Sequence, residues 1–231
     1  MNRSILGSMF FLMSLVLTAQ QNRYAQPELP GEIMIDLGVN QLIQTPDIME
    51  AKTIKSRSFA VYYMHIFKLN NYFTFNPAVG IAHEKINFER PVNYQAGDDE
   101  TIVFDTLFNR GAITKNKLAV NYIELPIEFR FFPLKTVKGE GLFLGVGGII
   151  GTRIESHTKV KYKVDENTKR SEKLRDNFGL ANFRLGVQAR MGLRGFHAFG
   201  KYYFTNLYGE GEGPEASTPS MFTVGITLSG F

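Results

Sequence analysis

A strict alternation of apolar and polar side chains along residues 122–132 constrains the fold more than any other feature of this sequence. Successive side chains of a β-strand point to opposite faces of the sheet. As a strand, this segment has an apolar face formed by Ile123, Leu125, Ile127, Phe129 and Phe131, and an opposite face formed by Tyr122, Glu124, Pro126, Glu128 and Arg130. A soluble protein would turn the apolar face toward its core, whereas a membrane barrel would turn it toward lipid and enclose the charges.

The same two-residue period recurs along the chain and predicts an all-β fold. Counting the segment above, it marks eight strands, at residues 31–40, 58–67, 72–88, 117–132, 141–156, 182–191, 196–204 and 221–231. In most of them one face is apolar, and the other carries glycine, alanine, threonine or charged residues. The second segment is so rich in apolar residues that its two faces cannot be assigned from the sequence.

The connections between these strands alternate between long, charged segments and tight turns. In an up-and-down meander this rhythm gathers the long connections at one end and the tight turns with both termini at the other, as in outer-membrane barrels. Strands of about 10 to 16 residues are long enough to cross a bilayer at a tilt. We therefore predict an eight-stranded, antiparallel up-and-down transmembrane β-barrel of the outer-membrane type.

A soluble eight-stranded barrel of the lipocalin type is the alternative. It would bury the apolar faces around a small ligand and expose the charges to water. The loop rhythm, the N-terminal export signal and a polar face that mixes small residues with charges favour the membrane barrel.

The first residues have the layout of a secretory signal peptide. A basic residue, Arg3, precedes an apolar run at residues 5–17. We predict a signal peptide at residues 1–19, a periplasmic N-terminal tail at residues 20–30 and an outer-membrane barrel domain at residues 31–231, which locates the protein in the cell outer membrane. No later stretch has the roughly 20 consecutive apolar residues of a transmembrane helix.

Composition excludes several classes of function. The chain has no cysteine, which excludes disulfides, thiol catalysis and cysteine metal sites. Its formal net charge is +4, but lysine and arginine are scattered among acidic residues, which argues against a nucleic-acid partner.

The polar faces of the strands predict a filled, charged barrel interior. Eight strands leave space for side chains but not for a wide channel. Because buried charges must be paired, we expect a structural charge network in the lumen formed by Glu124, Glu128, Arg130, Arg153, Glu155, Arg184 and Arg190. Such a network would plug the barrel, and we do not expect a general pore.

Aromatic residues near the strand ends predict girdles at the lipid interfaces. These residues are Tyr62, Tyr63, Tyr72, Phe73, Phe129, Phe131, Phe132, Phe196, Tyr202 and Tyr203. The chain ends in Phe231, which resembles the C-terminal aromatic of bacterial outer-membrane barrels. Phe231 is out of step with the apolar face of its strand, which requires either a bulge at Gly230 or a weaker assembly signal.

The motifs that could carry chemistry favour a protein that is not an enzyme. The glycines at residues 145–151 continue a strand and do not match a nucleotide-binding loop. Ser156 and His157 would point to opposite faces of a strand, which prevents a nucleophile–base pair. An outer-membrane enzyme would need a serine or an acid to converge with a histidine at one rim, and the other histidines are His65, His83 and His197.

An acidic segment is the one candidate metal site. Asp98, Asp99, Glu100 and Asp105 could offer carboxylate oxygens to calcium. We favour a solvated loop, and we expect neither a metal nor a cofactor.

Residues 122–127, Tyr-Ile-Glu-Leu-Pro-Ile, together with the glycine-rich strand at residues 142–151, resemble the PorT-type family of outer-membrane barrels typical of Bacteroidetes. The resemblance implies a component or accessory of a type IX-like protein secretion system. The alternative is a structural or surface-binding barrel of the small OmpA or OmpX kind, which would use its loops around Asp98, Lys163 and Glu210. The partners we expect are outer-membrane lipid and other envelope or secretion-system proteins.

Overall fold

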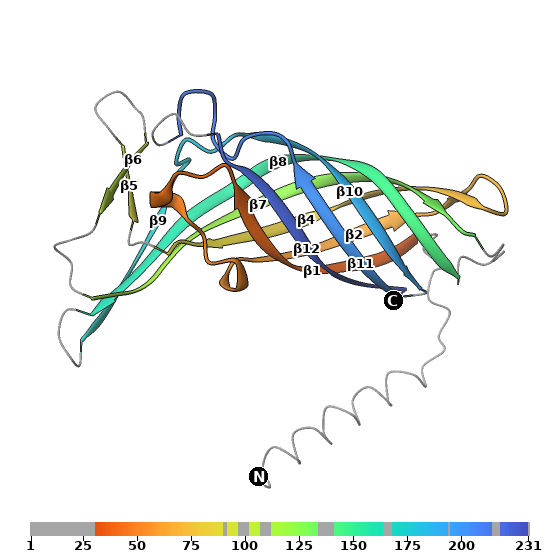
Figure 1. The fold of residues 1–231 in the computed structure, drawn as a ribbon, viewed down its shortest axis with the longest axis horizontal. Coiled ribbons are helices and arrows are strands. Elements are labelled where there is room, and N and C mark those ends of the chain that lie inside the picture. The colour runs from red at the N-terminus through yellow and green to blue at the C-terminus, as the bar shows by residue number, and fades with distance from the viewer. Residues whose placement is uncertain are drawn as a thin grey trace, which may run out of the picture. The chain divides into compact units, whose positions relative to one another are not determined.

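The computed structural model of the chain describes residues 31–89, 92–96, 102–106, 112–133, 141–163, 168–193, 195–213 and 218–230 (Figure 1). The predicted signal peptide and tail, the acidic residues 98–100 and Phe231 lie outside these residues. Gly230, where a bulge was one expectation, has a φ of +88°, a conformation that glycine adopts readily.

Eight antiparallel strands close into a barrel. They are β1 (Gly31–Ile43), β2 (Arg57–His65), β4 (Phe73–Asn87), β7 (Ala112–Phe131), β8 (Leu142–Lys163), β10 (Phe183–Leu193), β11 (Phe196–Tyr203) and β12 (Ser220–Ser229). Each strand pairs with the next in this order, and β12 pairs with β1, with Leu37 opposite Ile226, so that the sheet has no open edge around the barrel. This closure confirms the predicted up-and-down barrel and all eight predicted strands.

Two barrel strands are longer than the sequence indicated. β7 begins at Ala112 instead of residue 117, and β8 continues to Lys163 instead of ending near residue 156. The strand β9 (Lys169–Arg175) pairs with the extension of β8, inside a segment expected to be a loop. Figure 1 shows β7, β8 and β9 extending past the ends of the other barrel strands. These extensions are polar on at least one face throughout, so they lack the apolar period that identifies a membrane strand.

The remaining elements belong to the connections. A hairpin of β5 (Val92–Ala96) and β6 (Ile102–Thr106), which contains Asp105, lies in the connection between β4 and β7. The short strand β3 (Phe67–Lys68) pairs with β4, and two 3₁₀ turns, η1 (Asp47–Met49) and η2 (Thr53–Lys55), lie between β1 and β2. In the described part of the chain, no helix is both long enough and apolar enough to span a bilayer.

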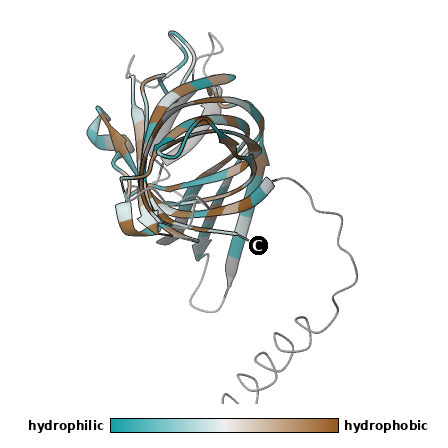
Figure 2. Cartoon of the chain, turned by 90° about the vertical axis from the view of Figure 1, so that its right-hand side faces the viewer, coloured by the Kyte–Doolittle hydropathy of each residue, from teal (hydrophilic) through white to brown (hydrophobic). Residues whose placement is uncertain are grey.

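The barrel is apolar outside and polar inside, the reverse of a soluble barrel. On β7, Ile123, Leu125 and Ile127 are 40–49% exposed, whereas Glu124 and Glu128 between them are at most 2% exposed. The same contrast holds on the other strands, and Figure 2, which looks along the barrel, shows apolar and polar residues alternating along its wall. A soluble protein could not leave this apolar surface in water, so the lipocalin-type alternative is wrong.

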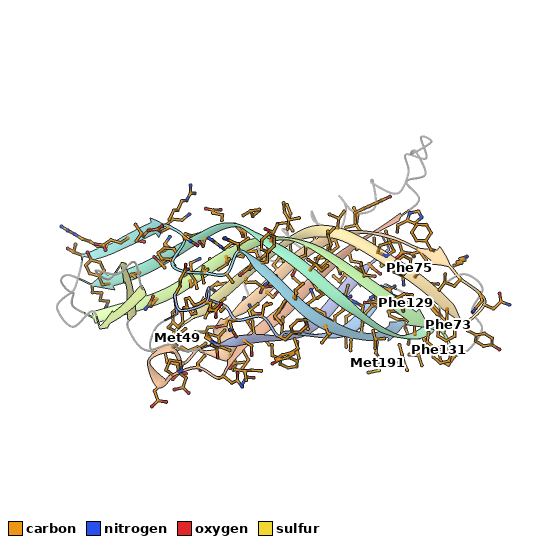
Figure 3. The ribbon with its side chains drawn as sticks, turned by 90° about the horizontal axis from the view of Figure 1, so that it is seen from above. Met49, Phe73, Phe75, Phe129, Phe131 and Met191 are labelled. Carbon is orange, nitrogen blue, oxygen red and sulfur yellow. The ribbon has the colours of Figure 1, made fainter. Side chains whose placement is uncertain are left out.

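Aromatic residues form an outer cluster at the tight-turn end. The Phe73 and Phe131 ring centroids lie 5.1 Å apart, as do those of Phe75 and Phe129 (Figure 3). Three residues expected in the girdles point instead into the barrel, where they are at most 5% exposed: Tyr62, Phe132 and Tyr203. The sequence misplaces these rings because it does not show which interior side chains they pack against.

Candidate functional site

Glu124 is the acceptor at the centre of one half of the barrel interior. It is fully buried and accepts hydrogen bonds from the hydroxyls of Tyr62 and Tyr203, the latter at 2.8 Å. It also pairs with Arg184, whose Nε lies 2.9 Å and whose Nη2 lies 2.7 Å from Glu124 Oε1. The carboxylate therefore receives donors from three other strands, which ties β7 to β2, β10 and β11.

Arg184 connects this cluster to β4, the third strand of the barrel, and to the rings of Tyr122 and Tyr203. Its Nη2 lies 3.2 Å from an oxygen of Glu84. Its guanidinium carbon lies 3.6 Å from the centroid of the Tyr122 ring and 4.2 Å from that of Tyr203. Cation–π contacts of this kind are stronger in a dry interior than at a surface.

Glu128 organises the other half of the interior. It pairs with Arg130 at 2.5 Å and with Arg190 at 3.1 Å, and it accepts a hydrogen bond from the amide of Gln188 at 2.9 Å. The Arg130 guanidinium also lies 4.3 Å from the centroid of the Phe143 ring. All four polar side chains are buried.

Asp36 and Lys201 join the two halves. Asp36 pairs with Arg190 at 3.0 Å and with Lys201 at 2.8 Å. The ammonium of Lys201 in turn donates a hydrogen bond to the hydroxyl of Tyr62 at 3.0 Å. Among the described residues, the buried acids are Asp36, Glu84, Glu124 and Glu128, and the buried permanent cations are Arg130, Arg184, Arg190 and Lys201, four of each sign. The interior is therefore neutral as a whole, as a dry network of charges requires.

Five of the seven residues predicted for the lumen network lie in it: Glu124, Glu128, Arg130, Arg184 and Arg190. Sequence reasoning missed Asp36, Glu84 and Lys201, although each is a charged residue within a predicted strand. Extending the face assignment of the fourth strand to the first, third and seventh strands would have found them.

Glu155 lies outside the network because β8 contains an irregularity, whereas Arg153, opposite Tyr122, turns to the connection between β9 and β10. The register shifts where Tyr122 faces Arg153 and Asn121 faces Glu155, so one extra residue on β8 reverses which positions point inward. Glu155 consequently lies on the outer face, where it pairs with Arg175 at 3.1 Å. Arg153 donates hydrogen bonds to Ser156 at 3.1 Å and to Asn182 at 2.7 Å, and so holds the connection between β9 and β10.

The glycine-rich strand leaves room for the network. A Cβ on Gly145 would lie 2.8 Å from a carboxylate oxygen of Glu128, and a Cβ on Gly151 would lie 3.0 Å from the Cγ of Arg184. These glycines are therefore small for packing reasons, which agrees with the structural interpretation of residues 145–151 over the nucleotide-binding one.

An apolar cluster covers the network at the long-connection end of the barrel. Met49 from η1 is fully buried there (Figure 3). It belongs to one cluster with residues from the strand ends and from the other connections: Leu42, Ile86, Phe88, Leu118, Val120, Tyr122, Ile149, Phe178, Leu180, Tyr203, Leu207, Tyr208 and Met221. The barrel is thus filled by ion pairs at its centre and by apolar side chains at this end.

The four histidines lie at three separate places. His65 stacks near Phe67 at the end of β2, and His197 is buried in the barrel with its ring 4.7 Å from that of Phe143. His83 and His157 lie on the outer face, next to Asn121 and Glu155 respectively. Ser156 is buried on the opposite face from His157, as expected, and bonds to a backbone oxygen of Asp176. The described residues contain no cluster of three or more groups that could hold a metal ion.

Comparison with known proteins gives one family match. The family model described as "Outer membrane protein beta-barrel domain" matches residues 18–209. No curated protein matches the chain.

Several solved structures are similar at low sequence identity. Ail, the attachment invasion locus protein of Yersinia pestis, in complex with the heparin analogue sucrose octasulfate, is 13% identical, with a TM-score of 0.37 over 87% of this chain and 100% of Ail. Another structure of Ail is 14% identical, with a TM-score of 0.35 over the same shares. A mutant of the Rh. blastica porin is 9% identical, with a TM-score of 0.21 over 87% of this chain and 98% of the porin.

Proposed function

This chain belongs to the outer membrane protein beta-barrel domain family and lies in the outer membrane, and from this premise we propose that it is a closed barrel that binds other molecules with its long-connection end, held outside the cell. In this proposal the barrel neither conducts solutes nor catalyses a reaction. The observation that carries it is the three-stranded extension of β7, β8 and β9 beyond the lipid-facing band.

The filled interior supports a role at the surface instead of transport through the barrel. The ion pairs of Glu124 and Glu128 and the apolar cluster around Met49 occupy the space that a channel would need. In planar bilayers we expect no steady single-channel conductance, and reproducible open channels would contradict this part of the proposal.

The extension offers a surface that the membrane does not cover. Leu174 on β9 is 51% exposed and lies beyond the apolar band of the barrel. Arg170 and Leu174, both exposed, share one face of the sheet, because residues four positions apart on a strand point the same way. A mixed apolar and charged face of this kind suits a protein partner.

A component or accessory of protein secretion is the second candidate function. It is favoured by the resemblance of residues 122–127 to the PorT-type family. Glu124 of this segment lies in the barrel interior, where it accepts hydrogen bonds from Arg184 and Tyr203.

Site-specific photo-crosslinking in native membranes tests the proposal. A photoreactive side chain at Leu174 should capture a partner, whereas the same group at Leu69, which is 58% exposed in a tight turn, is the matched control for the opposite end. Capture of secretion-system subunits, with loss of export of other proteins on gene deletion, would favour the second candidate. If Leu174 captures no protein, the surface-binding proposal is wrong.

A further inference from the structure

A small pocket enters the barrel wall between the first residues of β10 and the connection that follows β11. Its inner lining includes buried residues of three strands, and its outer lining includes exposed residues. The buried ones are Tyr122, Arg184, Tyr203 and Met221, and the exposed ones are Phe183 and Asn206. The pocket therefore leads from the outer surface of the barrel to the ion-pair network in its interior.

The hydrogen bonds between β10 and the segment after β11 explain this opening. The backbone nitrogen of Leu185 donates to the hydroxyl of Thr205 at 3.0 Å, so a side chain replaces a backbone group in the pairing. Four residues earlier in the chain, the backbone nitrogen of Ala181 donates to the carbonyl oxygen of Leu207 at 3.0 Å. The wall is closed by these two bonds, and the pocket enters between them, next to Phe183.

Arg184, at the inner end of the pocket, has an unused donor. Its side chain is buried, and its Nε and Nη2 donate to Glu124 at 2.9 Å and to Glu84 at 3.2 Å. Its Nη1 is also buried but has no hydrogen-bond partner among the described residues. Because the other two nitrogens point to the carboxylates, Nη1 is the one left to face the pocket. A buried donor without an acceptor is costly, and a guanidinium forms strong hydrogen bonds.

The surroundings of Arg184 Nη1 favour an uncharged acceptor. The guanidinium already lies between two carboxylates, and the described buried charges of the interior are four of each sign. An anion would therefore add a buried charge without a counterion. A hydroxyl would bring a donor of its own next to the rings of Tyr122 and Tyr203, whereas a carbonyl oxygen only accepts. The enclosed part of the pocket measures about 10 Å³, which admits one oxygen atom.

The mouth of the pocket lies where the apolar outer surface of these strands ends. Phe183 is 68% exposed, and Leu185 and Phe204 beside it are 40% and 53% exposed. Asn206, on the other side of the mouth, is polar and exposed. In a bilayer, this change from apolar to polar residues marks the boundary between the hydrocarbon and the headgroups. A molecule whose hydrocarbon chain lies along Phe183 would carry its carbonyl group at this boundary.

We propose that this pocket binds the carbonyl oxygen of an uncharged acyl ester or amide. Arg184 Nη1 donates to the oxygen, and the hydrocarbon chain packs on Phe183 and Leu185 at the outer surface. Two sources offer this chemistry, a lipid of the bilayer and a free lipophilic ester. The site is separate from the surface around Leu174, and it does not depend on which end of the barrel lies outside the cell.

A titration followed by nuclear magnetic resonance tests the proposal. The mature barrel is folded in micelles of an alkyl phosphocholine, a detergent without a carbonyl group, and methyl decanoate or dodecane is added. We expect methyl decanoate to shift the amide signals of Thr205 and Leu207 until they saturate. Dodecane, which has the same chain length but no acceptor, should bind at least about tenfold more weakly.

Three variants locate the binding. Ala181→Leu fills the pocket without removing a hydrogen-bonding group, and it should abolish the binding of methyl decanoate. Ala189→Leu, the same change at an exposed position of β10, should bind like the unaltered protein. Arg184→Lys keeps the charge but removes Nη1, and it should lose the preference for methyl decanoate over dodecane. A heat-dependent gel shift checks that each variant is folded, and Ala181→Leu decides the test if Arg184→Lys does not fold.

Three results would overturn the proposal. Equal affinities for methyl decanoate and dodecane would show that only the hydrocarbon chain is recognised. Tighter binding of the decanoate anion would show a site for anions. If neither probe shifts the signals of Thr205 and Leu207 to saturation, the pocket holds water alone.

Nanodiscs of ester-linked or ether-linked phosphatidylcholine distinguish the two sources of the carbonyl group. If a bilayer lipid supplies it, methyl decanoate will bind more weakly in the ester-linked lipid, whose own carbonyl groups compete. Equal binding in the two lipids would assign the pocket to a free lipophilic ester. Both results support the carbonyl site, because each requires methyl decanoate to bind.

Discussion

Asp36 on β1 accepts two hydrogen bonds from the guanidinium of Arg190 on β10, at 3.0 and 3.2 Å, across 154 residues of sequence. The strands β11 and β12 lie between them in the wall of the barrel, so this contact crosses the interior. Both side chains are at most 2% exposed. A buried two-pronged pair of this kind holds distant strands together only while both partners are present.

Replacing Arg190 with methionine is expected to lower the free energy of unfolding by about 3–5 kcal/mol, because Asp36 and Glu128 would lose a buried partner. Urea unfolding from lipid vesicles measures the change. The double variant Asp36→Asn, Arg190→Met should be less damaged than the single variant, since it removes one of the stranded charges. Arg175→Met, at an exposed position, is the matched control, and an Arg190→Met protein as stable as this control would contradict the network.

The glycine-rich strand gives a second prediction, based on space. Gly145→Ala should destabilise the barrel by about 1–3 kcal/mol, because the new Cβ would lie 2.8 Å from Glu128 Oε1 and displace a carboxylate with two arginine partners. Gly148→Ala is the control, because its Cβ would meet only a backbone oxygen at 3.9 Å. Equal unfolding curves for the two variants would show that Gly145 is not required for the packing of Glu128.

The lipid-facing surface gives a third prediction. Leu125 is 49% exposed in the middle of the apolar band, so Leu125→Arg should cost about 2–4 kcal/mol when the protein is folded in a bilayer. Ile54→Arg, at an 82% exposed position in η2, should cost nothing measurable. If both variants insert and unfold alike, Leu125 does not face lipid.

The fold could be predicted from sequence because membrane strands carry their environment in a two-residue period. Ile123, Leu125 and Ile127 are exposed on the outer surface of the barrel, and the alternation that identified them needs no long-range information. Strand count and order follow from the same pattern and from the alternation of connection lengths. The extension of β8 to Lys163 did not follow, because Lys159, Lys161 and Lys163 alternate with residues of mixed polarity.

The candidate site was predictable only in part, because partners in a closed barrel are set by register. Alternation placed Glu124 and Arg184 inside, but their pairing depends on strands that are 60 residues apart in sequence. A single irregularity on β8 moved Glu155 to the outer face, and such a shift leaves no mark in the local pattern. Tyr62 and Tyr203 were missed as lumen residues because their hydroxyls find Glu124, which is a tertiary contact.

His157 lies close to Lys117 and Lys173 on the neighbouring strands and gives the last prediction. It lies beyond the lipid-facing band, and burial, followed by the charges of Lys173 and Lys117, lowers its pKa below the ordinary value of 6.5, while Glu155 opposes the shift and His83 adds to it slightly. The unfolded chain therefore binds this proton more readily than the folded protein. The stability that neutral His157 contributes is complete above pH 6.5 and is lost as the pH falls below it.

Nuclear magnetic resonance titration of His157 should show the lowered pKa, and Lys117→Gln with Lys173→Gln should raise it toward 6.5, whereas Lys52→Gln with Lys55→Gln should not. A pKa of His157 that stays unchanged in the Lys117→Gln, Lys173→Gln variant would mean that the lysines do not act on this ring.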